Sequence, residues 1–279
     1  MDKIIAALDG LQYSESTRDY AIALAHHSKA HLVGVFLDDP TYTSYKIYEM
    51  VEQGGISEDK IRHLENNDKD TRAKSADDFE KTCQQAAIDY SLHHDRKIAI
   101  QELKHESIYA DLLVIDAKET LSHYEEKIPT RFIRELLGDV QCPVLVAPRK
   151  YKPIEKVVLL FDGEPSSVHA IKMFSYVLPE FRKLPTSIIS VNPPNSSLHL
   201  KDNKLMKEFM KRHYPNAVFN VLQGLPETEI IHHLKEEKEN TLVVLGAYRR
   251  GTVSRWFRES MADTLMRELK LPLFIAHNK

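Results

Sequence analysis

Two short segments of the sequence carry residue types that could hold an anionic ligand. The first is Asp162-Gly163, which follows an apolar run, and the second extends from Gly246 to Ser260. A serine at the start of a helix can cap it, and the free backbone N–H groups there favour an anion. The second segment also contains four arginines: Arg249, Arg250, Arg255 and Arg258. One interpretation is a phosphate site built from side chains. The alternative is a solvated loop whose arginines pair with acidic neighbours.

The sequence lacks the usual patterns of catalytic and metal sites. It contains neither a G-x-S-x-G nucleophile elbow nor a G-x4-G-K-[ST] phosphate loop. Neighbouring histidines, as in His232-His233, do not face one another on a helix and so do not form a chelate by themselves. His93-His94 lies at a strand end but has no thiolate partners at zinc spacing. We therefore expect no catalytic centre and no metal ion.

Composition narrows the class of protein further. The 279 residues include 38 basic and 41 acidic side chains, and the net charge of −3 argues against a nucleic-acid-binding protein. No apolar run approaches the roughly 20 residues of a membrane span. Residues 1–5 lead straight into an apolar strand rather than a signal peptide, and Cys83 and Cys142 resemble reduced core thiols. We expect a cytoplasmic protein without membrane contacts.

Three landmarks occur twice, in the same order, so the chain is a tandem duplication. Residues 3–10 (KIIAALDG) return as 156–163 (KVVLLFDG), 111–117 (DLLVIDA) as 241–247 (TLVVLGA), and 142–147 (CPVLVA) as 271–276 (LPLFIA). This predicts two domains, residues 1–149 and 153–279, with an insertion in the first at about residues 38–75. The insertion is either an elaborated connection with a longer second helix or a flap that covers a partner or ligand.

Short apolar runs alternate with helical patterns in each half. The strands expected in the first half are residues 3–8, 31–36, 88–92, 111–115 and 143–147. Continuous apolar runs are typical of strands buried on both faces, and this alternation predicts right-handed βαβ units. The predicted fold class is therefore α/β, with two tandem doubly wound parallel five-stranded sheets of the Rossmann-like type.

The two halves resemble tandem universal stress protein (UspA-type) domains over nearly the whole chain. The resemblance rests on the Asp-Gly after the first strand, the LVVLGA strand end, the serine that opens the last helix, and the LPLFIA strand. Nucleotide-binding members of the family carry G-x2-G-x9-G-[ST] after the fourth strand. The resemblance implies these nucleotide-binding candidates in the second half: Asp162, Gly163, Val191, Gly246, Arg249, Gly251, Ser260 and Met261. Arg249 and Glu259 stand where the family has its second and third glycines.

The first half departs further from that motif. Asp116 stands at the position of Gly246, Glu119 at that of Arg249, and Thr130-Arg131 replace Glu259-Ser260. Acidic residues at a phosphate position argue against nucleotide binding, so at most one degenerate ATP site is expected, in the second half.

The function that this implies is a non-enzymatic stress-response protein. The alternatives are an interaction module that has lost the ligand and, third, a slow ATPase. The expected partners are the other half of the chain in a pseudo-dimer, a second copy in a homodimer, and an unidentified protein. Residues 143–147 and 272–276 are the candidates for contact between the two halves.

Overall fold

The computed structural model describes residues 1–38, 58–95, 98–122, 124–247 and 260–277. Much of the insertion and the candidate ligands Arg249 and Gly251 lie outside these residues. Contacts between Cα atoms divide the chain into two compact units, Asp2–Cys142 and Pro143–Lys279. We call them the first unit and the second unit and describe each by itself. No helix in the described ranges is both long enough and apolar enough to cross a membrane.

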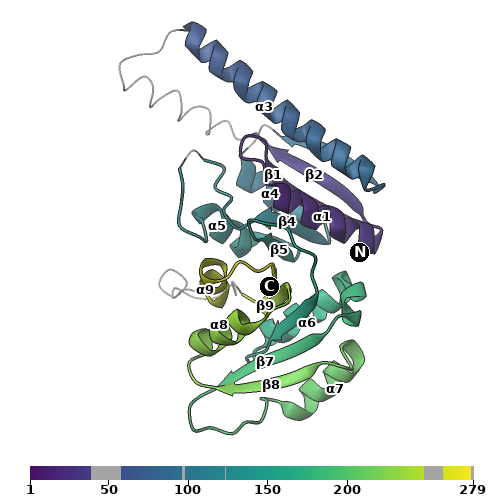
Figure 1. Ribbon diagram of the computed structural model, residues 1–279, viewed down its shortest axis with the longest axis vertical. Helices are drawn as coiled ribbons and strands as arrows, with labels where there is room; N and C mark the ends of the chain where they lie inside the picture. The colour runs from purple at the N-terminus through teal and green to yellow at the C-terminus, as the bar shows by residue number, and fades with distance from the viewer. Residues whose placement is uncertain (39–57, 96–97, 123, 248–259, 278–279) are drawn as a thin grey trace. The chain divides into compact units, whose positions relative to one another are not determined.

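The first unit is built from alternating strands and helices (Figure 1). Its elements are β1 (Lys3–Asp9), α1 (Glu15–Ser28), β2 (His31–Leu37), α3 (Glu58–Gln85), β3 (Tyr90–Asp95), α4 (Ala99–Glu106), the 3-10 helix η1 (Ser107–Tyr109), β4 (Leu112–Asp116) and α5 (Arg131–Asp139). The strand order is β3-β2-β1-β4, and all these pairings are parallel. Side chains 112–115 of β4 are fully buried, as expected for a strand covered by helices on both faces.

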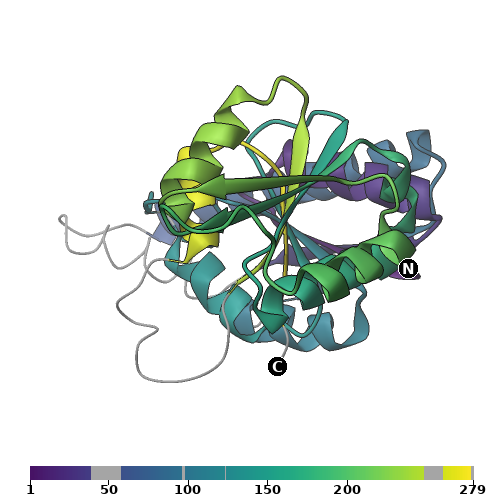
Figure 2. The same cartoon turned by 90° about the horizontal axis from the view of Figure 1, so that it is seen from below.

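The second unit repeats this arrangement. Its elements are β5 (Val144–Ala147), β6 (Lys156–Leu160), α6 (Pro165–Val177), the 3-10 helix η2 (Pro179–Lys183), β7 (Thr186–Asn192), α7 (Asn203–His213), β8 (Val218–Gln223), α8 (Pro226–Glu236), β9 (Thr241–Gly246), α9 (Met261–Glu268) and β10 (Leu273–Ala276). The strand order is β5-β10-β9-β6-β7-β8. Figure 2 shows α6 and α7 on one side of the sheet and α8 and α9 on the other, as right-handed crossovers require.

The predicted α/β class with parallel sheets is confirmed. The order β8-β7-β6-β9-β10 is parallel throughout, whereas β5 pairs antiparallel with β10, with Leu273 opposite Val146. This pairing places β5 in the second compact unit although it follows the helices of the first half in sequence. The two segments named from sequence as a contact, residues 143–147 and 272–276, are thus hydrogen-bonded neighbours.

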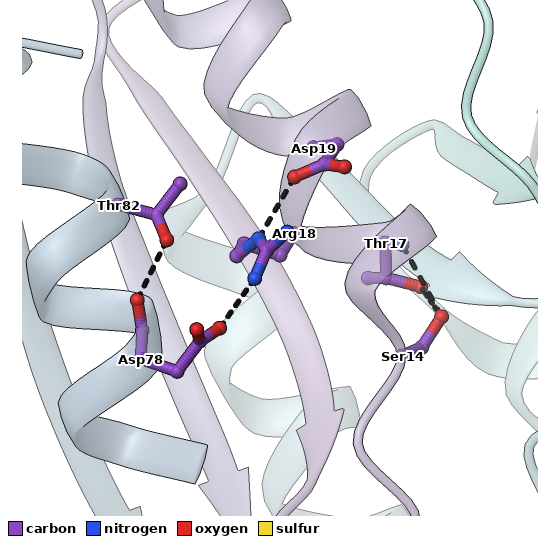
Figure 3. A network of polar contacts seen from close by, with 6 residues as sticks. All are labelled: Ser14, Thr17, Arg18, Asp19, Asp78 and Thr82. Atoms are coloured by element: carbon purple, nitrogen blue, oxygen red, sulfur yellow. Dashed lines mark hydrogen bonds and ion pairs between the residues drawn. The ribbon is translucent and has the colours of Figure 1, made fainter. Parts of the chain in front are cut away.

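Helix α3 joins the end of the insertion to the core of the first unit. Its Phe79 ring meets Phe36 of β2 edge to face, with ring centroids 5.9 Å apart. Arg18 of α1 donates from Nη1 to the Asp78 carboxylate of α3 and from Nε to Asp19 at 2.8 Å (Figure 3). Residues 58–75 therefore form the first part of a long helix that is fastened to α1 by an ion pair.

Candidate functional site

The candidate site of the second unit lies where the strand order reverses. Strand β6 pairs with β7 on one side and with β9 on the other. Open α/β sheets bind ligands outside the carboxyl ends of their strands at such a point. Asp162 and Gly163 follow β6, and Gly246 ends β9. The structure therefore brings these three predicted residues to the carboxyl ends of adjacent strands.

Gly246 is required by the close approach of β9 to the first turn of α6. A Cβ atom built on Gly246 would lie 2.4 Å from the carbonyl oxygen of Ser166 and 2.9 Å from the backbone nitrogen of Ser167. Contacts this short with backbone atoms force a shift of the helix or the strand. The glycine predicted to make room for a phosphate thus makes room for the protein's own helix.

Asp162 is exposed, and its backbone is covered by a lysine. Its Oδ1 accepts a hydrogen bond from the Glu164 backbone N–H at 2.9 Å, and its carbonyl oxygen accepts one from Lys201 Nζ at 2.9 Å. Gly163 has φ of +83°, and a Cβ there would lie 2.6 Å from Cδ of Lys201. The Lys201 side chain therefore lies across the end of β6 and supplies a cation that sequence reasoning missed.

Val191, the candidate on β7, is half-buried, and the polar residue beside it shapes the loop that follows. Asn192 is buried and donates from Nδ2 to the carbonyl oxygens of Ser197 at 2.7 Å and His199 at 2.9 Å. These bonds hold the loop that leads to Lys201. Asn192 therefore has an organising role at the site, and sequence reasoning did not assign it.

Ser260 caps α9, as its position predicted. Its Oγ accepts a hydrogen bond from the Asp263 backbone N–H at 3.1 Å and lies 2.9 Å from Asp263 Oδ1, to which it donates. Met261 is the first residue of the helix and is half-buried. Because Asp263 already places a carboxylate in the first helical turn, a phosphate at this helix start would compete with it.

At the matching place in the first unit, a carboxylate fills the end of β4. Asp116, which aligns with Gly246, accepts a hydrogen bond from the Ser14 hydroxyl at 2.6 Å through Oδ2. Ser14 caps α1, whose first residue is Glu15, whereas α6 begins at Pro165, before the matching serine Ser167. The earlier start of α6 is what brings its backbone against Gly246.

Glu119 is a buried carboxyl beside two other acids. Burial and the negative charges of Asp9 and Asp116 raise the pKa of Glu119 to about 8, although the backbone N–H groups of Leu121 and Thr120 oppose the shift. The two N–H groups lie 3.0 and 3.1 Å from Oε1. Glu119 is therefore mostly protonated at neutral pH. This carboxyl group stands where the resemblance places a phosphate loop. The negative charge that disfavours a polyphosphate there comes from its neighbours Asp9 and Asp116.

Helix α3 covers the strand ends of the first unit. Arg72 donates from Nη1 to the Leu37 carbonyl oxygen at 3.1 Å, and its Nη2 lies 3.0 Å from Asp38 Oδ1. The Ser75 hydroxyl donates to the Gly10 carbonyl oxygen at 2.8 Å. The carboxyl ends of β1 and β2 are thus in contact with side chains of the inserted segment, which no local sequence pattern indicated.

The structure corrects one part of the alignment between the halves. Thr130 caps α5 by accepting from the Ile133 N–H at 3.2 Å, just as Ser260 caps α9. Thr130 therefore corresponds to Ser260, and Arg131 to Met261, so pairing Thr130-Arg131 with Glu259-Ser260 was wrong by one residue. The physical reason is that the hydroxyl cap position is fixed by the helix start. Both halves keep that hydroxyl.

The histidines singled out from the sequence take part in local contacts. His93 Nδ1 lies 2.8 Å from Glu106 Oε1, and the His94 ring stacks on Phe36 with centroids 5.5 Å apart. His232 and His233 lie near Glu236 and Glu237 one turn along α8. Across the described parts of the chain, no group of three or more His, Cys, Asp or Glu residues is arranged to hold a metal ion.

Several solved structures share this architecture. A universal stress protein from Archaeoglobus fulgidus aligns over 99% of this chain and 98% of its own, with a TM-score of 0.72 and 14% identity. A protein assigned to the universal stress proteins from Pseudomonas aeruginosa UCBPP-PA14 aligns over 99% and 92%, with a TM-score of 0.61 and 14% identity. A functionally unknown protein from Pseudomonas aeruginosa PAO1 gives the same coverage, with a TM-score of 0.62 and 12% identity.

These likenesses, together with the strand orders, define the chain as an α/β protein of the doubly wound class. More particularly, it has the fold of the universal stress proteins, in tandem along its whole length. The resemblance inferred from the sequence is confirmed at the level of the fold. No protein-family model matches the sequence, and no curated protein does.

Proposed function

We propose that the protein is a tandem universal stress protein whose second half holds a single nucleotide site. ATP or a related nucleotide acts there as a regulatory signal rather than as a substrate. The supporting observation is the difference between Asp116 and Gly246 at matching strand ends. The first unit has the Asp116 carboxylate at this position, whose negative charge repels a polyphosphate, and a second, protonated acid nearby, Glu119. The second unit has neither acid at the equivalent positions.

The residues at the second strand end suit different parts of a nucleotide. The resemblance assigns adenine and ribose to Asp162 and Val191, at the ends of β6 and β7. Lys201 supplies a cation beside Asp162, and an ammonium group can form charge-assisted hydrogen bonds with phosphate oxygens. Gly163 and Gly246 add no side chain of their own at either strand end. We assign Arg249, Gly251, Ser260 and Met261 to the phosphate side on the resemblance alone.

The alternative function is an interaction module that keeps the fold without a ligand. Its support is the Ser260–Asp263 pair, in which the helix start already has its own hydroxyl and carboxylate. A slow ATPase is the third candidate, and release of phosphate from ATP in the presence of magnesium would demonstrate it.

Equilibrium dialysis of the full chain against labelled ATP tests the proposal. We expect one nucleotide per chain, and weaker binding for Asp162→Ala. Glu164→Ala is the matched control because it removes an exposed carboxylate two residues away. Binding that is unchanged in Asp162→Ala would contradict the placement of the site. Absence of binding to the wild-type chain would support the interaction module.

We also propose that the chain forms a homodimer, binds a further protein and acts in the cytoplasm. Light scattering on the protein as it elutes from a size-exclusion column measures whether the chain is a dimer. Fractionation of cells that express the protein shows whether it is in the cytoplasm.

A further inference from the structure

A serine, a histidine and an aspartate form a continuous hydrogen-bonded chain in the first unit, away from the carboxyl ends of its strands. His31 Nδ1 lies 2.8 Å from Asp89 Oδ2, and His31 Nε2 lies 2.9 Å from Ser91 Oγ. Both distances are those of good hydrogen bonds. A nucleophile bonded to a base, and a base bonded to an orienting acid, is the arrangement found in serine hydrolases of unrelated folds.

The parallel pairing of β2 with β3 brings these residues together. Leu32 donates its backbone N–H to the Asp89 carbonyl oxygen at 2.9 Å, and Val33 is the register partner of Ser91. Residues two apart on a strand point to the same face, so the side chains of Asp89 and Ser91 lie on one face with His31 between them. His31 and Ser91 thus lie on two paired strands, and Asp89 lies directly before β3 and is held to β2 by the Leu32 N–H.

The hydrogen bonds also set the protonation pattern of the imidazole. The Asp89 carboxylate can only accept, so it favours the tautomer of the neutral His31 ring that carries its proton on Nδ1. Nε2 is then left to accept the proton of the Ser91 hydroxyl. Solvent and small molecules reach the group, because the side chains of His31 and Asp89 are 35% and 83% exposed.

We propose that Ser91 is a nucleophile toward small activated esters, with His31 as the general base and Asp89 as the residue that positions the histidine. Ser91 Oγ attacks the carbonyl carbon and transfers its proton to His31 Nε2. The bond from that carbon to the leaving oxygen breaks, the leaving group takes the electron pair, the acyl group stays on Ser91, and His31 Nε2 gives its proton to solvent. His31 Nε2 then takes a proton from a water molecule, whose oxygen attacks the acyl carbon. The bond from that carbon to Ser91 Oγ breaks, and His31 returns the proton to Oγ. The acid is released and the Ser91 hydroxyl is restored.

A second group of polar side chains lies on the same face of the sheet as Ser91. Glu106 receives hydrogen bonds from His93 at 2.8 Å and from Lys3 Nζ at 3.2 Å. Partial burial would raise the pKa of Glu106, but these two hydrogen bonds outweigh it and lower the pKa, so the carboxylate is ionised. His93 is two residues after Ser91, and Lys3 is the register partner of His31. Lys3 forms an ion pair with Glu106 and offsets its charge, so the preference for neutral over anionic acyl donors rests on the Asp89 carboxylate beside His31.

The solvent exposure of His31 and Asp89 determines how fast we expect Ser91 to be acylated. Water screens the interaction between Asp89 and His31, so we expect acylation to be slow and confined to esters with good leaving groups. p-Nitrophenyl acetate meets both requirements, since it is neutral and releases a coloured phenolate.

The test treats the full-length chain with p-nitrophenyl acetate, follows phenolate release, and locates the acetyl group by peptide mass spectrometry. We expect the acetyl group on Ser91 and none there in Ser91→Ala. His31→Ala should lower the rate of Ser91 acylation about 100-fold, the lower range of general-base effects. Ser196→Ala and His232→Ala remove a comparable serine and histidine elsewhere and should leave that rate unchanged.

A test of Asp89 must distinguish a loss of its positioning role from a loss of folded protein. Asp89→Asn should slow acylation, and Asp89→Glu should restore part of the rate, while thermal unfolding of both stays at the wild-type temperature. Acetylation confined to lysines or the amino terminus, or equal phenolate release by Ser91→Ala and the wild type, would overturn the proposal.

Discussion

The Ser14 hydroxyl donates a hydrogen bond to Asp116 Oδ2 at 2.6 Å and so joins the cap of α1 to the end of β4. The corresponding residues of the second unit, Ser167 and Gly246, meet differently, because the backbone of α6 itself lies against the glycine. One strand end is thus filled by a carboxylate and the other by the backbone of a neighbouring helix. The group at the first strand end is charged and the group at the second is not, and this difference in charge is the basis on which we assign the nucleotide site to the second half.

The first prediction concerns the packing of Gly246. Gly246→Ala places a methyl group against the backbone of Ser166, and overpacking of this kind costs about 1–3 kcal/mol. Urea denaturation followed by circular dichroism should show that loss. Gly138→Ala is the control, because a Cβ on Gly138 of α5 meets no atom within 4 Å. It should leave stability unchanged or raise it by about 0.5–1 kcal/mol. Equal effects of the two substitutions would contradict the close approach.

The second prediction is a pH dependence that originates at Glu119. Its pKa is about 8 in the folded chain against a usual value of 4.5, so the folded state binds more protons than the unfolded state between these pH values. The contribution of Glu119 to the free energy of unfolding therefore falls as pH rises from about 5 to 8, with a slope of at most about 1.4 kcal/mol per pH unit. Glu119→Gln should become increasingly stabilising, relative to the wild type, over the same range.

Urea titrations at several pH values measure the effect of Glu119→Gln. Glu125→Gln serves as the control, since Glu125 is exposed and its substitution should leave the difference from wild type constant with pH. A Glu119→Gln difference that is also constant with pH would show that Glu119 is ionised in the folded chain.

The third prediction concerns the attachment of α3 to α1 through Arg18 and Asp78. Arg18 is largely buried and also lies over the Tyr13 ring at 5.9 Å, whereas its partner Asp78 is half exposed, so one member of this ion pair is shielded from water. A double-mutant cycle with Arg18→Met and Asp78→Ala should give a coupling energy of about 1 kcal/mol. The exposed pair Lys81–Asp77 on the same helix should give about 0.3–0.5 kcal/mol. A larger coupling energy for Lys81–Asp77 than for Arg18–Asp78 would show that Asp78 does not hold α3 against α1.

The fold was predictable because its signals are local and occur twice. The runs at residues 3–10 and 156–163 identify matching first strands, and each apolar stretch such as 112–115 is long enough for one buried strand. The first strand ended within one residue of its prediction, whereas the third begins at Tyr90 rather than residue 88. The pairing of β5 with β10 depends on contacts between distant segments, so its antiparallel register could not be derived from either segment alone.

The site was predictable only in part. Asp162, Gly246 and Ser260 follow from the motif, and the structure places each at a strand end or helix start. Lys201 and Arg72 were missed because each reaches a backbone carbonyl about 35 to 39 residues away through a flexible side chain. The hydrogen-bonded group of Asp89, His31 and Ser91 was missed because it depends on the register in which β2 and β3 pair. The alternation of polar residues at 89, 91 and 93 is the only local signal.

Calorimetric titration of ATP into the full-length chain tests the central claim most directly, with Asp162→Ala and the matched first-half variant Asp9→Ala measured alongside. We predict one nucleotide per chain, with affinity lowered about tenfold or more by Asp162→Ala, as for loss of a hydrogen bond to a charged group. Asp9→Ala should leave the affinity unchanged provided that its circular dichroism spectrum matches the wild type. Two nucleotides per chain, or a loss of binding in Asp9→Ala but not in Asp162→Ala, would contradict the assignment of the site to the second half.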